Sequence, residues 1–177
     1  CKRWCIMPTR ENMVELKIHH QFEEIPETEW DALLQKNCCN GPFLRHAYLS
    51  RWWRYKGGGE WSEEAELAII SARKDGILIG IAPFFRATHE GRKKMLFLGS
   101  IEISDYLDVI HDPKYSAEFF DSLFNFLNGE NFKDIEGFLF YNVPEQSLTC
   151  AYIEKECAKY GWQAKCEQAY HTPIIHL

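Results

Sequence analysis

The chain has 177 residues, of which 46% are apolar and 26% charged. This length and apolar content are enough to form the buried core of one domain, and the composition excludes a disordered tail. Its formal net charge of −6 argues against nucleic acid as a partner, because nucleic-acid binding needs a concentrated basic surface. It contains no apolar run of about 18 residues, so we expect no membrane span. The seven cysteines include no Cys-x-x-Cys pair, and neither they nor the histidines show metal-ligand spacing. We therefore expect reduced thiols, a cytoplasmic protein and no metal.

The first elements follow an N-terminal extension. Residues 1–12 carry charges and lack the apolar centre of a signal peptide, and Met13 directly precedes the first periodic segment. We interpret residues 1–12 as an extension and residues 13–177 as a single domain. Within the domain, alternating apolar and polar residues over 14–19 predict a half-buried strand.

Two helices are predicted next. Pro26 opens the first, whose apolar face is formed by Trp30, Leu33 and Leu34. Pro42 opens the second, and the glycine run 57–59 ends it. Its predicted buried face is formed by Leu44, Tyr48, Trp52 and Tyr55.

A series of strands follows the helices. Residues 66–72 and 77–85 read as two strands joined by the tight turn Lys74-Asp75-Gly76. A further turn at 88–93 leads into a strand over 94–98. The basic run Arg92-Lys93-Lys94 fits a solvated hairpin, and a phosphate site is the alternative.

The last part of the chain alternates strands and helices. An apolar strand over 106–111 precedes a helix that Ser116 caps, with a buried stripe formed by Phe119, Phe120, Leu123, Phe124 and Leu127. A strand over 135–143 and a helix over 145–160 follow, and Gly161 ends that helix. Further strands are predicted to begin at 162–166 and to run over 170–177.

This element order predicts a mixed α/β fold of the α+β kind, with a mostly antiparallel sheet flanked by helices. It resembles the order of the GNAT acyltransferase superfamily over residues 14–177. The resemblance implies the GNAT fold, in which the mixed sheet splays open into a V that admits the pantetheine arm of CoA. It also implies transfer of an acyl group from acetyl-CoA or another acyl-CoA, without a metal, to an amine or hydroxyl of a small molecule or sugar.

Short segments are similar to the cellulose-biosynthesis-type (CelD/BcsL) branch of GNAT-like proteins. They are Pro42-Phe43 before Trp52-Trp53, residues 79–84, Leu98-Gly99, Asp105-Tyr106-Leu107-Asp108 and residues 143–147. Members of this branch resemble two GNAT-type halves in tandem, and this chain is similar to the first half. The alternative function is therefore a non-catalytic half that scaffolds, or binds substrate for, a partner catalytic half. The partner would be that second half, or a second copy paired through the exposed final strand.

GNAT domains bind the CoA pyrophosphate at a helix N-terminus, where backbone N–H groups and the helix dipole stabilise an anion. The resemblance places this role on Tyr115, Ser116 and Ala117. The usual Arg/Gln-x-x-Gly-x-Gly/Ala pattern is absent, and Glu118 adds a negative charge beside the site. Two interpretations stay open: a helix cap with a structural role, or an anion site built on Ser116 and free N–H groups.

The candidate catalytic residues are Asp105, Tyr106 and Asp108. Strand alternation would send Tyr106 and Asp108 to one face, where a phenol and a carboxylate could bind or deprotonate an acceptor. The alternative is that Asp105 caps the strand entry and that backbone donors satisfy Asp108.

Three further residues are candidates for substrate binding, each with a structural alternative. Arg86 could hold a carboxylate or phosphate, or form a surface salt bridge. Trp52 could line a cleft or belong to the core, and Glu145 could orient an amine or cap a helix.

Overall fold

The computed structural model describes residues 13–99 and 103–168. The helices are α1 (Glu27–Leu34), α2 (His46–Lys56), α3 (Ser116–Leu127) and α4 (Leu148–Tyr160). The strands are β1 (Val14–His19), β2 (Glu66–Leu67), β3 (Ile69–Lys74), β4 (Ile77–Ala82), β5 (Phe84–His89), β6 (Arg92–Phe97), β7 (Ile110–His111) and β8 (Gly137–Leu139). The extension over 1–12 and the strand predicted over 170–177 lie outside the described residues.

The strands form two four-stranded sheets with the orders β1-β3-β4-β7 and β2-β5-β6-β8. All pairings in the first sheet are antiparallel, and in the second only β6 and β8 run parallel. The predicted mixed, mostly antiparallel sheet flanked by helices is therefore confirmed. The predicted turn between β3 and β4 is also present, with φ values of 50° at Asp75 and 78° at Gly76.

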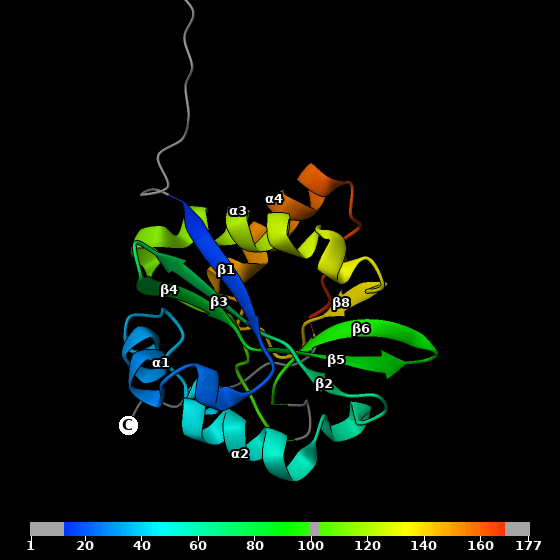
Figure 1. Ribbon diagram of the computed structural model, residues 1–177. Coiled ribbons are helices and arrows are strands. Elements are labelled where there is room, and N and C mark those ends of the chain that lie inside the picture. The colour runs from blue at the N-terminus through cyan, green and yellow to red at the C-terminus, as the bar shows by residue number, and fades with distance from the viewer. Residues whose placement is uncertain (1–12, 100–102, 169–177) are drawn as a thin grey trace, which may run out of the picture.

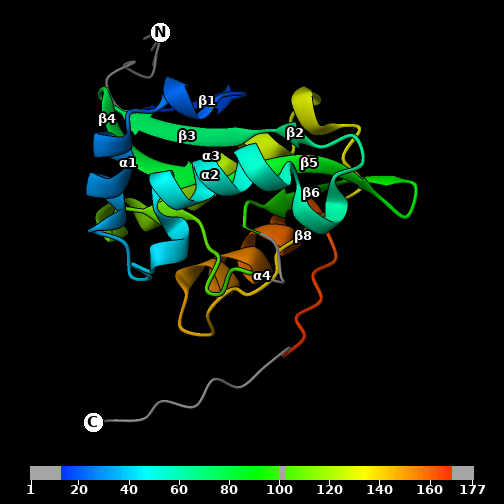
Figure 2. The same ribbon diagram turned by 90° about the horizontal axis from the view of Figure 1, so that it is seen from below.

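The helices cover the two faces of the sheets, with α1 and α2 on one side and α3 and α4 on the other (Figures 1 and 2). Each face has its own apolar cluster because successive strand residues point to opposite sides. Phe85 packs with Trp30 and Trp52 in one cluster, and Phe84 packs with Phe119 in the other. The apolar stripe predicted for α3 is buried as expected at Phe119, Phe120, Leu123, Phe124 and Leu127.

Several predicted strands are shorter than expected. The strand predicted over 77–85 is divided at Pro83 between the two sheets, since proline cannot donate a ladder hydrogen bond. The segments predicted over 66–72, 106–111 and 135–143 are likewise only partly strand. No strand begins within residues 162–168. The shortening within 106–111 and 135–143 matters for function because these segments contain or adjoin the predicted residues Tyr106, Asp108 and Glu145.

Three helix predictions need correction. Tyr55 is 76% exposed, so it does not share the buried face of α2, whereas Leu49 does. Ser116 is the first residue of α3 and not its N-cap, which is Tyr115. The last helix begins at Leu148, so residues 145–147 precede it.

Candidate functional site

The candidate site lies where two parallel segments separate. Strands β6 and β8 pair over Lys94–Leu96 and Gly137–Leu139. Further along, the Leu107 N–H donates to the Asn142 carbonyl at 3.0 Å. Beyond this hydrogen bond one segment continues as β7 beside β4, while the other turns into α4. We call this point of separation the fork.

Asp108 lies at the fork and is almost fully buried, with 3% of its surface exposed. Its carboxylate accepts hydrogen bonds from the Ser147 hydroxyl at 2.5 Å and from the Thr149 hydroxyl at 2.5 Å. The Val109 N–H donates at 2.8 Å, and the neighbouring Cys39 thiol also favours the charged form of the carboxylate. Burial outweighs these donors and raises the pKa of Asp108. The carboxylate therefore ties β7 to the N-terminal end of α4.

A second contact covers the edge of β7 that faces away from β4. The buried side chain of Asn37 accepts the His111 N–H at 3.1 Å and donates to the Val109 carbonyl at 3.5 Å. It also donates to the Cys39 carbonyl at 2.9 Å, which holds the loop after α1 in place. An amide side chain thus pairs with the backbone groups that an extended ligand would use.

The N-terminal end of α3 follows β7 directly. Asp112 accepts the Lys114 N–H through its side chain at 3.0 Å and the Tyr115 N–H through its carbonyl at 2.9 Å. The Ser116 N–H donates to the Pro113 carbonyl. These backbone donors are therefore engaged within the chain. The predicted cofactor residues sit here with different exposures: Tyr115 is half-buried, Ser116 buried and Ala117 exposed.

His111 is buried under the start of α3, where its ring stacks on Phe119 with a centroid separation of 5.5 Å. Its Nε2 atom lies 3.0 Å from the Ser116 hydroxyl, which also donates to the Pro113 carbonyl. The Nδ1 atom has no hydrogen-bond partner among the described residues. Burial lowers the pKa of His111 to about 4, so the ring is neutral at physiological pH.

Lysines and carboxylates alternate around this helix end. Lys36 donates to Asp112 at 3.2 Å, and Lys74 pairs with Glu118. The ammonium groups of Lys74 and Lys114 lie 5.6 Å and 5.2 Å from the centre of the Tyr115 ring. Glu118 therefore has a cation beside it, so the negative charge noted in the sequence is partly compensated. An anion placed here would compete with Asp112 and Glu118 for these lysines.

The three candidate catalytic residues do not share a face. Tyr106 has a left-handed φ of 56°, which breaks the predicted alternation. It is 41% exposed, whereas Asp108 is buried. Asp105 is exposed as well. The structure agrees better with the alternative, in which hydrogen bonds satisfy Asp108, although the donors include the Ser147 and Thr149 hydroxyls as well as the Val109 N–H.

The candidate substrate residues lie outside the fork. Arg86 is a residue of β5, not of a strand end, where it covers the Phe132 ring at 5.1 Å and donates to the Asn131 carbonyl. Trp52 belongs to the core against Phe85, so it does not line a cleft. Glu145 is exposed and precedes α4 by three residues, so it is not part of that helix.

Four residues at the fork were not predicted from the sequence: Asn37, Cys39, Ser147 and Thr149. Ser147 could have been found, because it is the N-cap of α4 and accepts the Thr149 N–H at 3.0 Å. A serine followed by a periodic helix is the ordinary signal for that role. The other three carry no local signal, since the contacts that bring them to Asp108 and β7 join segments far apart in the sequence.

Over residues 13–99 and 103–168, no group of three or more His, Cys, Asp or Glu could hold a metal ion. In the same part of the chain, none of the helices has the length and apolar character that crossing a bilayer requires.

The chain has low-identity likenesses among solved structures, and the three that follow are acetyltransferases by name. One is the ribosomal-protein-alanine N-acetyltransferase from Brucella melitensis biovar Abortus 2308, with 15% identity, a TM-score of 0.45, and coverage of 91% of this chain and 99% of that chain. A possible acetyltransferase from Clostridium difficile 630 has 13% identity, a TM-score of 0.46 and coverage of 93% and 99%. A predicted acetyltransferase with acetyl-CoA from Clostridium acetobutylicum has 12% identity, a TM-score of 0.43 and coverage of 90% and 96%. No family model and no curated protein matches the chain.

Proposed function

We propose that this chain is a GNAT-type acyltransferase domain, which transfers an acyl group from acyl-CoA to an amine or hydroxyl of a small molecule or sugar. The observation that carries the proposal is the fork: parallel β6 and β8 pair over three residues, the segments then separate, and α3 begins directly after β7. A separating pair of parallel segments with a helix N-terminus at its end has the layout needed for a pantetheine arm and a pyrophosphate.

The chemistry that this layout would support is direct attack. The acceptor nitrogen or oxygen bonds to the thioester carbonyl carbon, the carbon–sulfur bond breaks, and the CoA thiolate leaves. A base removes the proton that the acceptor loses. Asp108 has a raised pKa, which favours proton uptake, but its donors must move aside before it can reach an acceptor. Asp105 and Tyr106, both exposed, would then contact the acceptor near the entrance of the fork.

A second candidate function is a non-catalytic half that scaffolds, or binds substrate for, a partner catalytic half. It is favoured by one specific observation: both routes into the fork are occupied by the chain itself. Asp108 joins β7 to α4, and Asn37 pairs with the outer edge of β7. A ligand that needs these groups must first break their hydrogen bonds, and this lowers its apparent affinity.

Direct binding separates the two candidates. We would titrate CoA and acetyl-CoA by calorimetry to about 1 mM and follow the melting temperature in parallel. The acyltransferase proposal expects saturable binding that Lys114→Glu weakens, because Lys114 lies beside the start of α3. The control is Lys133→Glu. Lys133 is another exposed lysine, but it lies after the C-terminal end of α3, where it forms an ion pair with Glu130. Absence of binding to about 1 mM would overturn the first candidate and support the second.

A further inference from the structure

Helix α2 carries a row of exposed basic side chains. Its exposed cations are Arg45 at the N-cap, then Arg51, Arg54 and Lys56. None of them forms an ion pair within residues 13–99 and 103–168, although Arg54 lies over the Tyr55 ring at 5.8 Å. Elsewhere on the described surface, lysines and arginines commonly have a carboxylate partner, as in Lys17–Glu24, Arg73–Glu29 and Lys93–Asp134. The α2 surface is therefore unusual for an acidic chain.

The helix dipole accounts for only part of this surface. Cations near a helix C-terminus are stabilised by the dipole, which suits Arg54 and Lys56 in the last turn. Arg45 stands at the opposite end, where the dipole disfavours a positive charge, and no acidic residue occupies the first turn. In the folded chain the Asp31 carboxylate of α1 accepts the His46 N–H at 3.2 Å and supplies a negative charge at that end, so Arg51, Arg54 and Lys56 are the cations that a further partner would meet.

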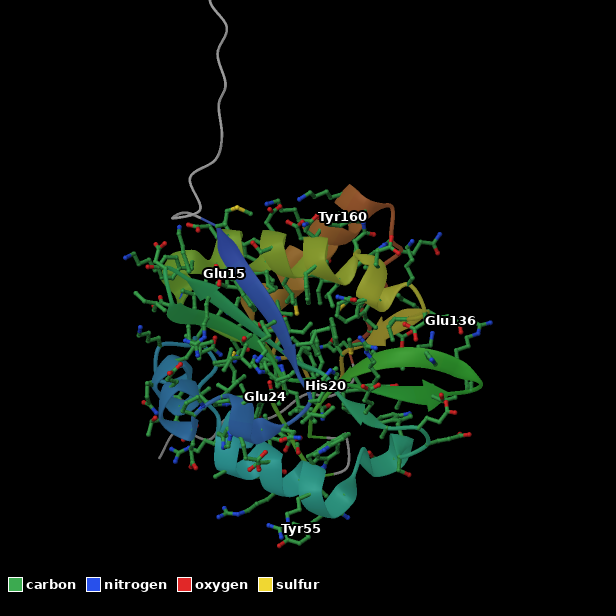
Figure 3. The ribbon with its side chains drawn as sticks, in the orientation of Figure 1. Glu15, His20, Glu24, Tyr55, Glu136 and Tyr160 are labelled. Atoms are coloured by element: carbon green, nitrogen blue, oxygen red, sulfur yellow. The ribbon has the colours of Figure 1, made fainter. Side chains whose placement is uncertain are left out.

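An aromatic side chain lies among these cations. Tyr55 is 76% exposed, more than any other large apolar or aromatic side chain in the described part of the chain. Figure 3 shows it at the far side of α2, pointing away from the body of the molecule. Exposed tyrosines flanked by arginines have the composition found at the centre of protein–protein interfaces.

A cluster of glutamates follows the helix at once. After Gly57 ends α2 in the left-handed conformation, the chain folds back so tightly that a Cβ on Gly58 would lie 2.8 Å from the Ala65 Cβ. Glu63 and Glu64 are exposed within this compact turn. A basic segment and an acidic segment therefore adjoin one another along α2 and its C-terminal turn, with Tyr55 near their boundary.

We propose that α2 and this turn form a self-complementary surface that binds a second copy of the chain. In a two-fold symmetric pair with antiparallel α2 helices, Arg51 and Arg54 of one copy face Glu63 and Glu64 of the other, and the reverse contact forms at the same time. The two Tyr55 side chains meet near the symmetry axis. This inference is independent of the proposed function.

A second copy fits better than other occupants. The net charge of −6 opposes nucleic acid as a partner, and it also opposes association of two copies except where opposite charges meet locally. One helix and one turn offer a small contact area, so the dimer should be weak and sensitive to salt, with a dissociation constant in the micromolar range or above.

The test is sedimentation equilibrium of the full chain at about 50 mM and about 500 mM NaCl. We expect a reversible dimer at low salt whose dissociation constant rises at least about tenfold at high salt. A chain that stays monomeric at low salt to hundreds of micromolar overturns the proposal, and so does a dimer whose affinity does not change with salt.

A charge swap identifies the surface. Arg51→Glu with Arg54→Glu, and separately Glu63→Lys with Glu64→Lys, should each be monomeric, whereas an equimolar mixture of the two variants should dimerise again. Because Glu64 accepts a hydrogen bond from the Thr88 hydroxyl, Thr88→Ala is the control that removes this bond without changing charge, and it should dimerise like the parent. Lack of recovery in the mixture overturns the antiparallel arrangement. If the Arg51→Glu/Arg54→Glu variant and the Glu63→Lys/Glu64→Lys variant each dimerise alone, the interface lies elsewhere.

Discussion

Two junctions flank strand β7, the fork before it and the start of α3 after it, and they bury polar groups in different ways. At the fork, the Asp108 carboxylate is surrounded by donors from Ser147, Thr149 and the backbone. At the start of α3, the buried ring of His111 keeps one nitrogen without a partner among the described residues, and aromatic stacking holds it instead. The fork is thus fixed by hydrogen bonds and the α3 junction by close packing. Substitutions at the two junctions should therefore destabilise the fold for different physical reasons.

The packing at the α3 junction should show the largest effect. Gly80 in β4 pairs with His111, and a Cβ there would lie 2.2 Å from the Phe119 ring. Neither the ring nor the strand can move away without displacing α3, so Gly80→Ala should lower the free energy of unfolding by about 3 kcal/mol or more. Urea unfolding measured by circular dichroism would give the value.

The matched control for this change is Gly41→Ala. Gly41 has a negative φ of −86°, and a Cβ there would meet nothing within 4 Å. We expect a change within about 0.5 kcal/mol, because the added methyl group neither clashes nor strains the backbone. Equal effects of the two substitutions would show that the close approach of α3 to β4 does not hold this junction.

The hydrogen bonds at the fork should show the next largest effect. Asp108→Ala leaves the buried Ser147 and Thr149 hydroxyls without their acceptor, and we expect a loss of about 2–3 kcal/mol in the free energy of unfolding. Asp108→Asn keeps one acceptor oxygen and should lose about half as much. Urea titrations of both variants, with Asp105→Ala as an exposed carboxylate control, would measure the difference.

The relative stabilities of these variants test whether hydrogen bonds hold the fork closed. If Asp108→Asn were as stable as the parent while Asp108→Ala were not, a single oxygen would be enough to hold β7 to α4. If Asp108→Ala were no worse than Asp105→Ala, the hydrogen bonds would contribute nothing to closing the fork. The second candidate function would then lose its supporting observation.

The parts of the fold that follow local rules were predictable from the sequence. The stripe of Phe119, Phe120 and Leu123 has helical spacing, and the Asp75-Gly76 turn has the residues that a positive φ requires. The division of the strand over 77–85 could also have been predicted, because Pro83 cannot donate a hydrogen bond within a sheet. It was missed because the apolar residues continue on both sides of the proline.

The candidate site was less predictable, because its contacts are long-range. Asp108 was identified as a candidate from the sequence, but its neighbours were not. Thr149 lies 41 residues after it in the sequence, and Cys39 lies far before it. Tyr106 was misplaced because a left-handed φ at a tyrosine leaves no mark in an alternating pattern. Burial of Asp108 depends on how α4 meets β7, and this is set by tertiary packing.

The unpartnered nitrogen at the α3 junction should make stability depend on pH. Burial lowers the pKa of His111 from 6.5 to about 4, so the unfolded chain binds more protons than the folded chain between these values. Stability should therefore fall as the pH drops from about 6.5 to about 4, with His111 contributing roughly 2 kcal/mol of the loss. Urea titrations at several pH values would record it.

The control must separate His111 from His19, whose pKa burial also lowers. His111→Gln removes the titrating ring and should flatten the dependence by the amount that His111 contributes, while the remaining slope belongs to His19 and the carboxylates. An unchanged slope in His111→Gln would mean that the ring is solvated when charged, and that the α3 junction opens readily.

The smallest effect is expected at the one hydroxyl that the α3 junction uses. Ser116→Ala removes the contact to His111 Nε2 and the hydrogen bond to the Pro113 carbonyl, and should cost about 1 kcal/mol in the free energy of unfolding. Ser122→Ala, two turns later in the same helix, should cost nothing or stabilise slightly, because alanine favours the helix. If the two variants were equal in urea unfolding, the hydroxyl would be dispensable and packing alone would position α3. A loss at Ser116 as large as that of Asp108→Ala would instead show that both junctions of β7 depend on hydrogen bonds.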